Sequence, residues 1–250
     1  MRRGRFRTAG AALAAVLLTG CAQFAGPAGH PTAGKPARAG GRAAPAPPVL
    51  DHVSTTDRAV FLTYDDGADR DPRLTALIRE RRLPVTLFLT DTVAGPAYGH
   101  FARLRSVGAS LQNHTLDHRS LRGLPYAGQR AEICGQQAKL HSRFGVHPRL
   151  FRPPYGRYDP TTLRAAADCG ITAVVLWRAT LTPDGPLTYT RGDPHLHPGD
   201  IVSVTAPART EELLQQIEER DLRVGRLEDC LGRSSAVGRS DPAERSGAVG

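Results

Sequence analysis

Two segments of the chain carry side chains that could bind a metal ion and activate water. Asp65 and Asp66 are adjacent and precede Gly67, and His114 and His118 lie four residues apart further along the chain. Neutral imidazole together with a carboxylate forms a common catalytic zinc shell, in which water takes the open position. The second carboxylate could then accept a proton from that water. These residue types therefore predict metal-assisted hydrolysis.

A third segment, Arg152-Pro-Pro-Tyr-Gly156, is a stiff loop. Each proline fixes φ, so the Arg152 side chain and the backbone N–H of Tyr155 would be held in place. Each motif also has a plainer interpretation. Aspartates favour turns because their side chains bond the nearby backbone. A lone histidine pair is often a solvated helix face, and the arginine could belong to a structural turn.

The elements that must position these residues alternate between strands and helices. Runs of β-forming residues bounded by turn residues predict strands at 58–64, 85–89, 109–113, 149–151, 171–177, 200–205 and 223–227. Apolar residues at helical spacing predict helices at 72–82, 98–107, 126–144, 160–168 and 211–220, with Gly170 as a C-cap. This alternation predicts a parallel sheet covered by helices, in a closed or nearly closed barrel. The candidate residues follow predicted strands, and the carboxyl ends of barrel strands converge on one mouth.

Together and in this order, three segments resemble the motifs of a known family. Thr63-Tyr-Asp-Asp-Gly67, His114-Thr-Leu-Asp-His118 and Arg152-Pro-Pro-Tyr-Gly156 are similar to those of the polysaccharide deacetylases, the NodB-homology domain of carbohydrate esterase family 4. The resemblance covers roughly residues 57–231. It implies an α/β fold, a distorted (β/α)7 barrel, that removes N- or O-acetyl groups from glycans. The implied cofactor is Zn²⁺ or another divalent metal such as Co²⁺.

The resemblance also implies a role for individual residues. Asp66, His114 and His118 would hold the metal, and Asp65 would be the general base.

Further site residues follow from the same resemblance. Arg152 would orient the general base, and the Tyr155 backbone N–H would help hold the oxyanion. Pro153 and Trp177 would line the substrate pocket, and the alternative for Trp177 is that it fills the core.

Two positions depart from the family pattern. The family ends a later strand with Leu-x-His, and that histidine protonates the leaving amine, but Thr205 stands there and completes the expected pocket. The family often has acidic residues just after the tryptophan, where this chain has Arg178. His195 and His197 precede the strand, so we expect them at the opposite end of the barrel, in a surface loop.

These departures leave two functions open. The first is a hydrolase that removes acetyl groups from an N-acetylated (or O-acetylated) cell-envelope polysaccharide. The second is a catalytically weakened, glycan-binding lipoprotein, since a threonine hydroxyl is a poor general acid. A third function, that of a purely structural lipoprotein, would require all three site motifs to be coincidental.

The N-terminus resembles a lipoprotein signal. Arginines and a short apolar run lead to Leu18-Thr-Gly-Cys21, which resembles a lipobox, and the run is too short to span a bilayer, which needs about 20 residues. We expect residues 1–20 to be a signal peptide and Cys21 to be lipidated. That would anchor the protein to the cell membrane on its extracytoplasmic face; a secreted protein is the alternative. Residues 21–49 predict a disordered linker, 50–231 a single domain and 232–250 a disordered tail.

The net charge and the cysteines give further expectations about binding partners and about a disulfide. The net charge is +9, but seven basic residues and no acidic ones precede residue 50, so the domain is near neutral. The domain has no basic stripe with interleaved aromatic residues, which argues against nucleic-acid binding. We also expect the protein to be a monomer. A Cys134–Cys169 disulfide is plausible if the helices that carry these residues are neighbours, which would leave Cys230 over.

Overall fold

The computed structural model describes residues 45–66 and 72–231. The expected signal peptide, the lipidated Cys21, most of the expected linker and the tail from residue 232 lie outside the described residues. Within the described ranges, no helix combines the length and the apolar character needed to cross a membrane.

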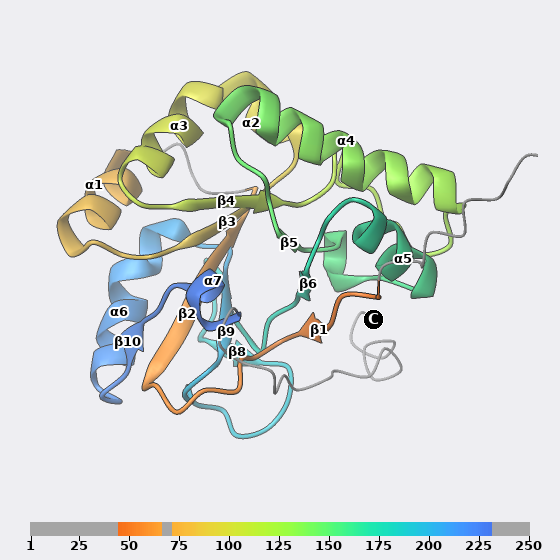
Figure 1. Cartoon of the computed structure of the whole chain (residues 1–250). Helices are drawn as coiled ribbons and strands as arrows, with labels where there is room; N and C mark the ends of the chain where they lie inside the picture. Colours follow the sequence, from red (N-terminus) through yellow and green to blue (C-terminus); the bar gives the residue numbers. More distant parts are fainter. Residues whose placement is uncertain (1–44, 67–71, 232–250) are drawn as a thin grey trace, which may run out of the picture. The chain divides into compact units, whose positions relative to one another are not determined.

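The strands form one mostly parallel sheet (Figure 1). Its order is β1-β6-β5-β4-β3-β2-β9-β7-β8, and β10 also pairs with β2. All neighbours are parallel except β7 and β8. The strands are β1 Val49–Leu50, β2 Ala59–Asp65, β3 Thr86–Leu89, β4 Ser110–Asn113, β5 Leu150–Phe151, β6 Ala173–Val175, β7 Ala179–Leu181, β8 Thr188–Tyr189, β9 Ile201–Val204 and β10 Arg223–Val224. The α/β fold and the distorted barrel are therefore as expected.

Helices lie on the outside of these strands (Figure 1). They are α1 Pro72–Arg81, α2 Asp91–Ala94, α3 Tyr98–Ser106, α4 Tyr126–Phe144, α5 Pro160–Asp168, α6 Thr210–Glu218 and α7 Leu227–Leu231, with 3-10 turns at Gly95–Ala97, Pro154–Gly156 and Pro207–Arg209. Helix α5 begins with a capping box between Asp159 and Thr162. Its C-cap is Cys169, and the expected Gly170 follows with a φ of 79°, where glycine is favoured.

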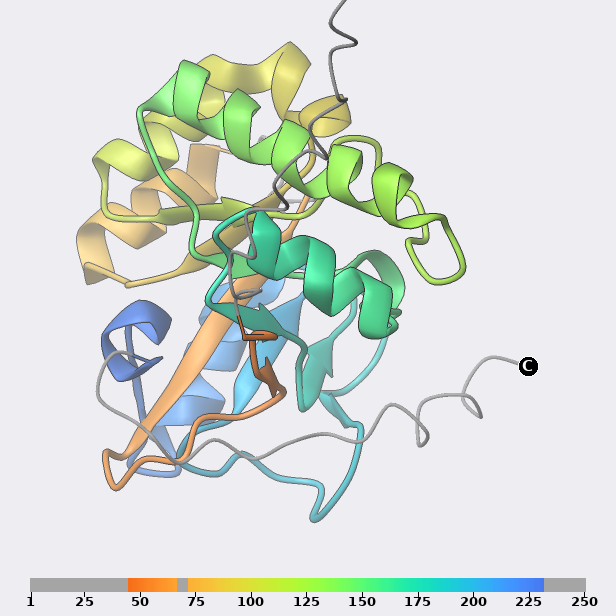
Figure 2. The same cartoon turned by 45° about the vertical axis from the view of Figure 1, so that its right-hand side comes forward.

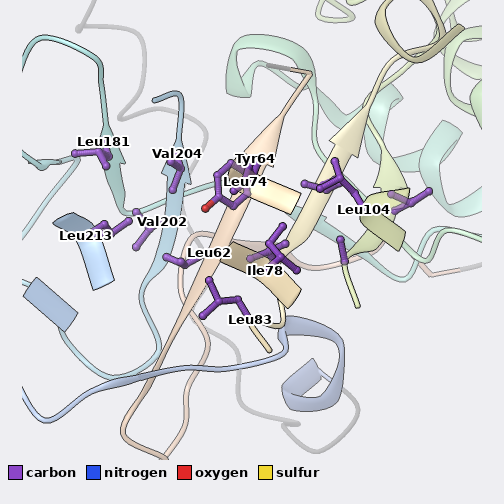
Figure 3. Packing of buried hydrophobic residues seen from close by; sticks show 14 of the residues in the cluster. Leu62, Tyr64, Leu74, Ile78, Leu83, Leu104, Leu181, Val202, Val204 and Leu213 are labelled. Atoms are coloured by element: carbon purple, nitrogen blue, oxygen red, sulfur yellow. The ribbon is translucent and has the colours of Figure 1, made fainter. Parts of the chain in front are cut away.

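The largest core cluster lies between the sheet and helices α1, α3, α4 and α6. Figure 3 shows Leu62 and Tyr64 of β2 between the α1 side chains Leu74 and Ile78 and the β9 side chain Val202. Full burial of such a side chain contributes about 1.5–3 kcal/mol. This packing fixes β2, whose last residue is Asp65, in the middle of the sheet.

The predicted disulfide is confirmed. Helices α4 and α5 lie side by side (Figures 1 and 2), and Cys134 bonds to Cys169 with their Cα atoms 5.1 Å apart. Cys230 takes no part in that bond.

Three boundary predictions were wrong. Val49 pairs with Val174 in β1, so the expected domain start at residue 50 cuts through a strand. The strand predicted at 223–227 stops at Val224, and helix α7 follows it. The strand predicted at 171–177 is shorter than expected, since β6 spans only Ala173–Val175. The chain then forms β7, which pairs with β9. Pairing with strands elsewhere in the chain determines where these short elements begin and end, and local β-propensity does not reveal that pairing.

Candidate metal and catalytic site

The candidate residues lie at the carboxyl ends of adjacent parallel strands. The residues at these ends are Asp65 and Asp66 at β2, Thr90 after β3, His114 after β4, Arg152 after β5 and Trp177 after β6. The sheet thus brings together segments that the sequence separates.

Asp66, His114 and His118 come together as a candidate metal site. One possible ligand atom of each lies within 4.8 Å of the others. The His114 and His118 rings are 4.8 Å apart between centroids. His114 is buried, and the other two side chains are half-buried. Two imidazoles and one carboxylate suit zinc and similar divalent ions, so the donor set fits the expected cofactor.

The hydrogen bonds of the histidines favour metal binding. His114 Nδ1 lies 2.7 Å from the Arg152 carbonyl oxygen, which can only accept, so Nδ1 carries the proton and Nε2 is left as a ligand. Burial, together with the nearby His114, lowers the pKa of His118 below its ordinary value. Both effects favour the neutral imidazole that binds metal.

Thr90 holds the carboxylate of Asp66 on both sides. The Thr90 backbone N–H donates to Oδ1 at 2.6 Å, and its hydroxyl donates to Oδ2 at 2.7 Å. Hydrogen bonds to an ionised carboxylate are among the stronger ones in proteins. Sequence reasoning missed Thr90; its position directly after a predicted strand was the available signal.

Arg152 is fully buried and binds Asp65. Its Nη1 donates to Asp65 Oδ1 at 2.6 Å, and its Nη2 donates to Thr63 Oγ1 at 2.8 Å. The guanidinium stacks over the Phe88 ring, with Cζ 4.3 Å from the centroid. Burial lowers the pKa of Arg152, and the Asp65 charge opposes that shift. The arginine therefore fixes the carboxylate that the family resemblance implies to be the general base.

The loop between the two histidines is strained and braced by helix α4. Thr115 and His118 have φ angles of 77° and 54°, which non-glycine residues rarely adopt. Glu132 Oε2 accepts the backbone N–H groups of Leu116 and Asp117, both at 3.1 Å. Strain of this kind persists where the surroundings enforce it, often at functional sites. Glu132 is a second positioning residue that sequence reasoning missed, because it lies in a separate helix.

Tyr155 and the predicted pocket residue Pro153 lie in the loop after Arg152, and the predicted pocket residue Trp177 lies beside Arg152. Tyr155 has a φ of 59°, is 62% exposed, and its ring lies 4.8 Å from the His118 ring. Trp177 lies beside Arg152, whose Cζ is 5.3 Å from the tryptophan ring. Pro153 is buried at the base of the loop. These placements fit a pocket wall, and the individual roles stay predictions.

The two departures from the family pattern have different surroundings. Thr205 follows β9 at the same edge of the sheet as the site, is exposed, and donates its hydroxyl to the Leu181 carbonyl at 3.0 Å. Arg178 instead faces Asp200, with Nε 3.4 Å from Oδ1, before β9 begins. Arg178 therefore lies at the amino end of β9. His195 and His197 also precede β9, as expected, but both are half-buried.

This geometry defines a barrel with a candidate divalent-metal site and a carboxylate–arginine pair at one mouth. The family model described as "Polysaccharide deacetylase" matches residues 52–174. The chain belongs to the polysaccharide deacetylase family. Solved structures of carbohydrate esterases of family 4 share its fold.

Among relatives, an uncharacterized protein of Streptomyces coelicolor is 68% identical over 249 residues, covering 92% of this chain and 100% of that protein. The peptidoglycan-N-acetylglucosamine deacetylase of Bacillus cereus is 28% identical over 111 residues, 44% of this chain. The chain spans only 40% of that enzyme's length.

Two solved structures from Bacillus anthracis share the fold. A family 4 carbohydrate esterase has a TM-score of 0.64 at 18% identity, over 74% of this chain and 88% of that one. A protein described as a CE4 family pseudoenzyme has a TM-score of 0.63 at 17% identity, over 74% of this chain and 69% of that one.

Proposed function

We propose that this protein is a metal-dependent hydrolase that removes acetyl groups from an N-acetylated (or O-acetylated) polysaccharide of the cell envelope. The observation that carries the proposal is the Asp65–Arg152 pair beside the Asp66, His114 and His118 cluster. A protein that only bound metal and glycan would have no need of a second carboxylate fixed by a buried arginine.

The ligand set would be Asp66, His114 and His118. A bound Zn²⁺ or Co²⁺ would supply Lewis acidity and lower the pKa of water at the site. Thr90 orients the aspartate, and the Arg152 carbonyl orients His114. Both contacts act on the ligands from outside, as the partners of metal ligands commonly do.

Asp65 would accept the proton of the attacking water. Its Oδ1 already accepts from Arg152 at 2.6 Å, which assigns proton transfer to Oδ2. The buried guanidinium pairs with the Asp65 carboxylate and holds it in place beside the candidate metal ligands. The Tyr155 backbone N–H, in the loop that follows Arg152, would stabilise the developing oxyanion.

The leaving group is where this chain differs from the family pattern. The Thr205 hydroxyl donates to the Leu181 carbonyl, so its proton is already engaged. An alkoxide leaves without protonation more readily than an amide anion does, so we expect ester substrates to suffer less than amides from the missing histidine.

A second candidate function also rests on Thr205. Without an acid at position 205, the protein would bind glycans through the site and turn them over slowly. The exposed Tyr155 ring and the adjacent Trp177 would offer aromatic surfaces for sugar rings in either case.

The expected location supports an envelope substrate. A lipid on Cys21 would hold the domain at the outer face of the cell membrane, near the wall glycans that the named Bacillus cereus relative acts on. We propose a monomer that binds a carbohydrate polymer and no nucleic acid.

The test is acetate release by the full chain with added zinc, from N-acetylglucosamine oligomers and from acetylated xylan. Release that depends on zinc and falls in Asp65→Asn supports the hydrolase. Absence of release by protein that binds both zinc and the oligomers supports the glycan-binding alternative.

A further inference from the structure

A second group of metal-binding side chains lies away from the proposed active site. Asp193, His195 and His197 belong to the segment that connects β8 to β9, before β9 begins. The proposed site lies at the carboxyl ends of the strands, so this group lies at the amino end of β9. It has no part in the deacetylation proposed above.

The three side chains are close enough to share one ion. One possible ligand atom of each lies within 4.8 Å of the others. The His195 and His197 rings are 4.3 Å apart between centroids, and His197 Nε2 is 4.0 Å from Asp193 Oδ2. The chain bends between the first two of these residues, since the His195 backbone N–H donates to the Asp193 carbonyl at 2.8 Å, and this bend brings their side chains within reach of one ion. The intervening Leu196 is 4% exposed and packs into the main core cluster, which turns its neighbours outward.

An independent observation concerns the other nitrogen of His197. Nδ1 is buried and has no hydrogen-bond partner in the described part of the chain, yet it lies 3.9 Å from Asp200 Oδ2. That oxygen accepts the His197 backbone N–H at 2.9 Å. A small ring movement would let Nδ1–H donate to the carboxylate, and metal-binding histidines are typically oriented in this way. Nε2 would then face Asp193 as the ligand atom.

The connection is held at both sides of the three residues. Arg191 binds Asp51 with two hydrogen bonds, of 2.9 and 2.7 Å, and Asp200 lies 3.4 Å from Arg178 Nε. Binding would therefore order few additional groups, which limits its entropic cost.

We propose that Asp193, His195 and His197 form a second divalent-metal site, distinct from the one at the mouth of the barrel. Imidazole and carboxylate ligands suit zinc-class ions rather than Ca²⁺ or Mg²⁺, which prefer oxygen ligands. Three protein ligands leave a position for water. The ion would hold the turn from Asp193 to His197 together ahead of β9.

The test counts zinc ions per chain by equilibrium dialysis of the full chain. The double variant Asp193→Asn/His195→Gln removes two ligands and leaves His197 in place. A matched control is His141→Gln/His147→Gln, a second histidine pair whose rings are 4.2 Å apart and which forms no candidate metal group with acids in the described residues.

We expect the wild type and the control to bind one more zinc ion than Asp193→Asn/His195→Gln does. This difference holds whether or not the site at the barrel mouth binds, so failure of the proposed function remains distinguishable. Equal stoichiometry in wild type and Asp193→Asn/His195→Gln would overturn the proposal, as would an equal loss in the control.

A milder variant guards against misfolding of the double variant. His195→Gln changes one half-buried side chain, and the visible spectrum of bound Co²⁺ reports ligand identity directly. In the His118→Gln background, which removes a ligand of the first candidate site, we expect His195→Gln to change the Co²⁺ spectrum. An unchanged spectrum would contradict the proposal.

Discussion

The Thr90 hydroxyl offers a sharp test of how the metal ligand Asp66 is held. Thr90→Val replaces the hydroxyl by a methyl group of similar size, in a side chain that is fully buried. The backbone N–H of residue 90 still donates to Asp66 Oδ1, so of the two bonds to Asp66 only the 2.7 Å bond to Oδ2 is lost. The carboxylate would then be free to turn about the remaining bond.

The size of the effect follows from that bond. A hydrogen bond to a charged group is worth about 1.5–3 kcal/mol. Loss of a group that orients a metal ligand typically costs about 10- to 100-fold in affinity, which corresponds to roughly 1.4–2.8 kcal/mol. The two estimates agree, so we expect Thr90→Val to lower the zinc affinity of the site that contains Asp66 by about 10- to 100-fold.

The assay is competition for Zn²⁺ between the protein and a chromophoric chelator. Thr90→Ser is the matched control, because it keeps the hydroxyl and removes only the methyl group. Thr90 also caps helix α2, where its side chain accepts the Val93 N–H, so unfolding of the metal-free proteins is measured alongside. Equal affinity in Thr90→Val and Thr90→Ser would refute the positioning role.

Three further predictions concern the disulfide, a buried ion pair and the missing acid. Replacing both Cys134 and Cys169 by serine should lower the free energy of unfolding by about 4 kcal/mol on the chain-entropy model, since the bond spans 35 residues. Asp51→Asn should destabilise the protein by about 1–3 kcal/mol at pH 7, because Asp51 is buried against Arg191, and that deficit should shrink below about pH 4. Thr205→His should raise amide deacetylation by up to about 10²–10⁴-fold, and ester deacetylation less.

The sign of the pH effect follows from the pKa of Asp51. Burial alone would raise it, but hydrogen bonds from His52 and Arg191 and their charges outweigh burial and hold the pKa well below its usual range. The stabilisation is therefore present above the unfolded value and is lost as pH falls. Urea unfolding of Asp51→Asn and wild type from pH 3 to 8 measures it, and a deficit that is constant across this range would contradict the assignment.

The other two predictions have equally direct checks. Reduced wild type should unfold at the same urea concentration as the double serine variant; a clear difference would show that the substitutions act through packing. For Thr205→His, equal gains on amide and ester substrates would contradict the leaving-group argument.

The sequence predicted most of the parallel sheet because its strands and helices are locally distinct. Helices α4 and α5 begin and end where the apolar spacing and glycine signals placed them. Strands β1 and β7 were not predicted, since two or three residues carry too little local signal and form only by pairing with β6 and β9.

The candidate metal and base residues could be predicted from the sequence because they belong to recognisable motifs at the ends of strands. The groups that hold them could not. Thr90 and Glu132 belong to no motif, and only the folded chain brings them to Asp66 and to the loop before His118. Likewise, the resemblance indicated that Arg178 stands where the family often has an acidic residue, but not that it faces Asp200 at the amino end of β9.

The most direct test of the central claim separates metal binding from catalysis at the barrel mouth. Asp65→Asn is compared with His118→Gln for bound zinc and for acetate release in the same samples. Because the Asp65 change leaves the buried Arg152 without its charge partner, thermal unfolding first establishes that the variant is folded at the assay temperature. We predict that Asp65→Asn retains the zinc of the wild type and loses acetate release, whereas His118→Gln binds one zinc ion fewer than the wild type and loses release. Wild-type release by Asp65→Asn, or by a His118→Gln variant that binds one zinc ion fewer, would contradict the account.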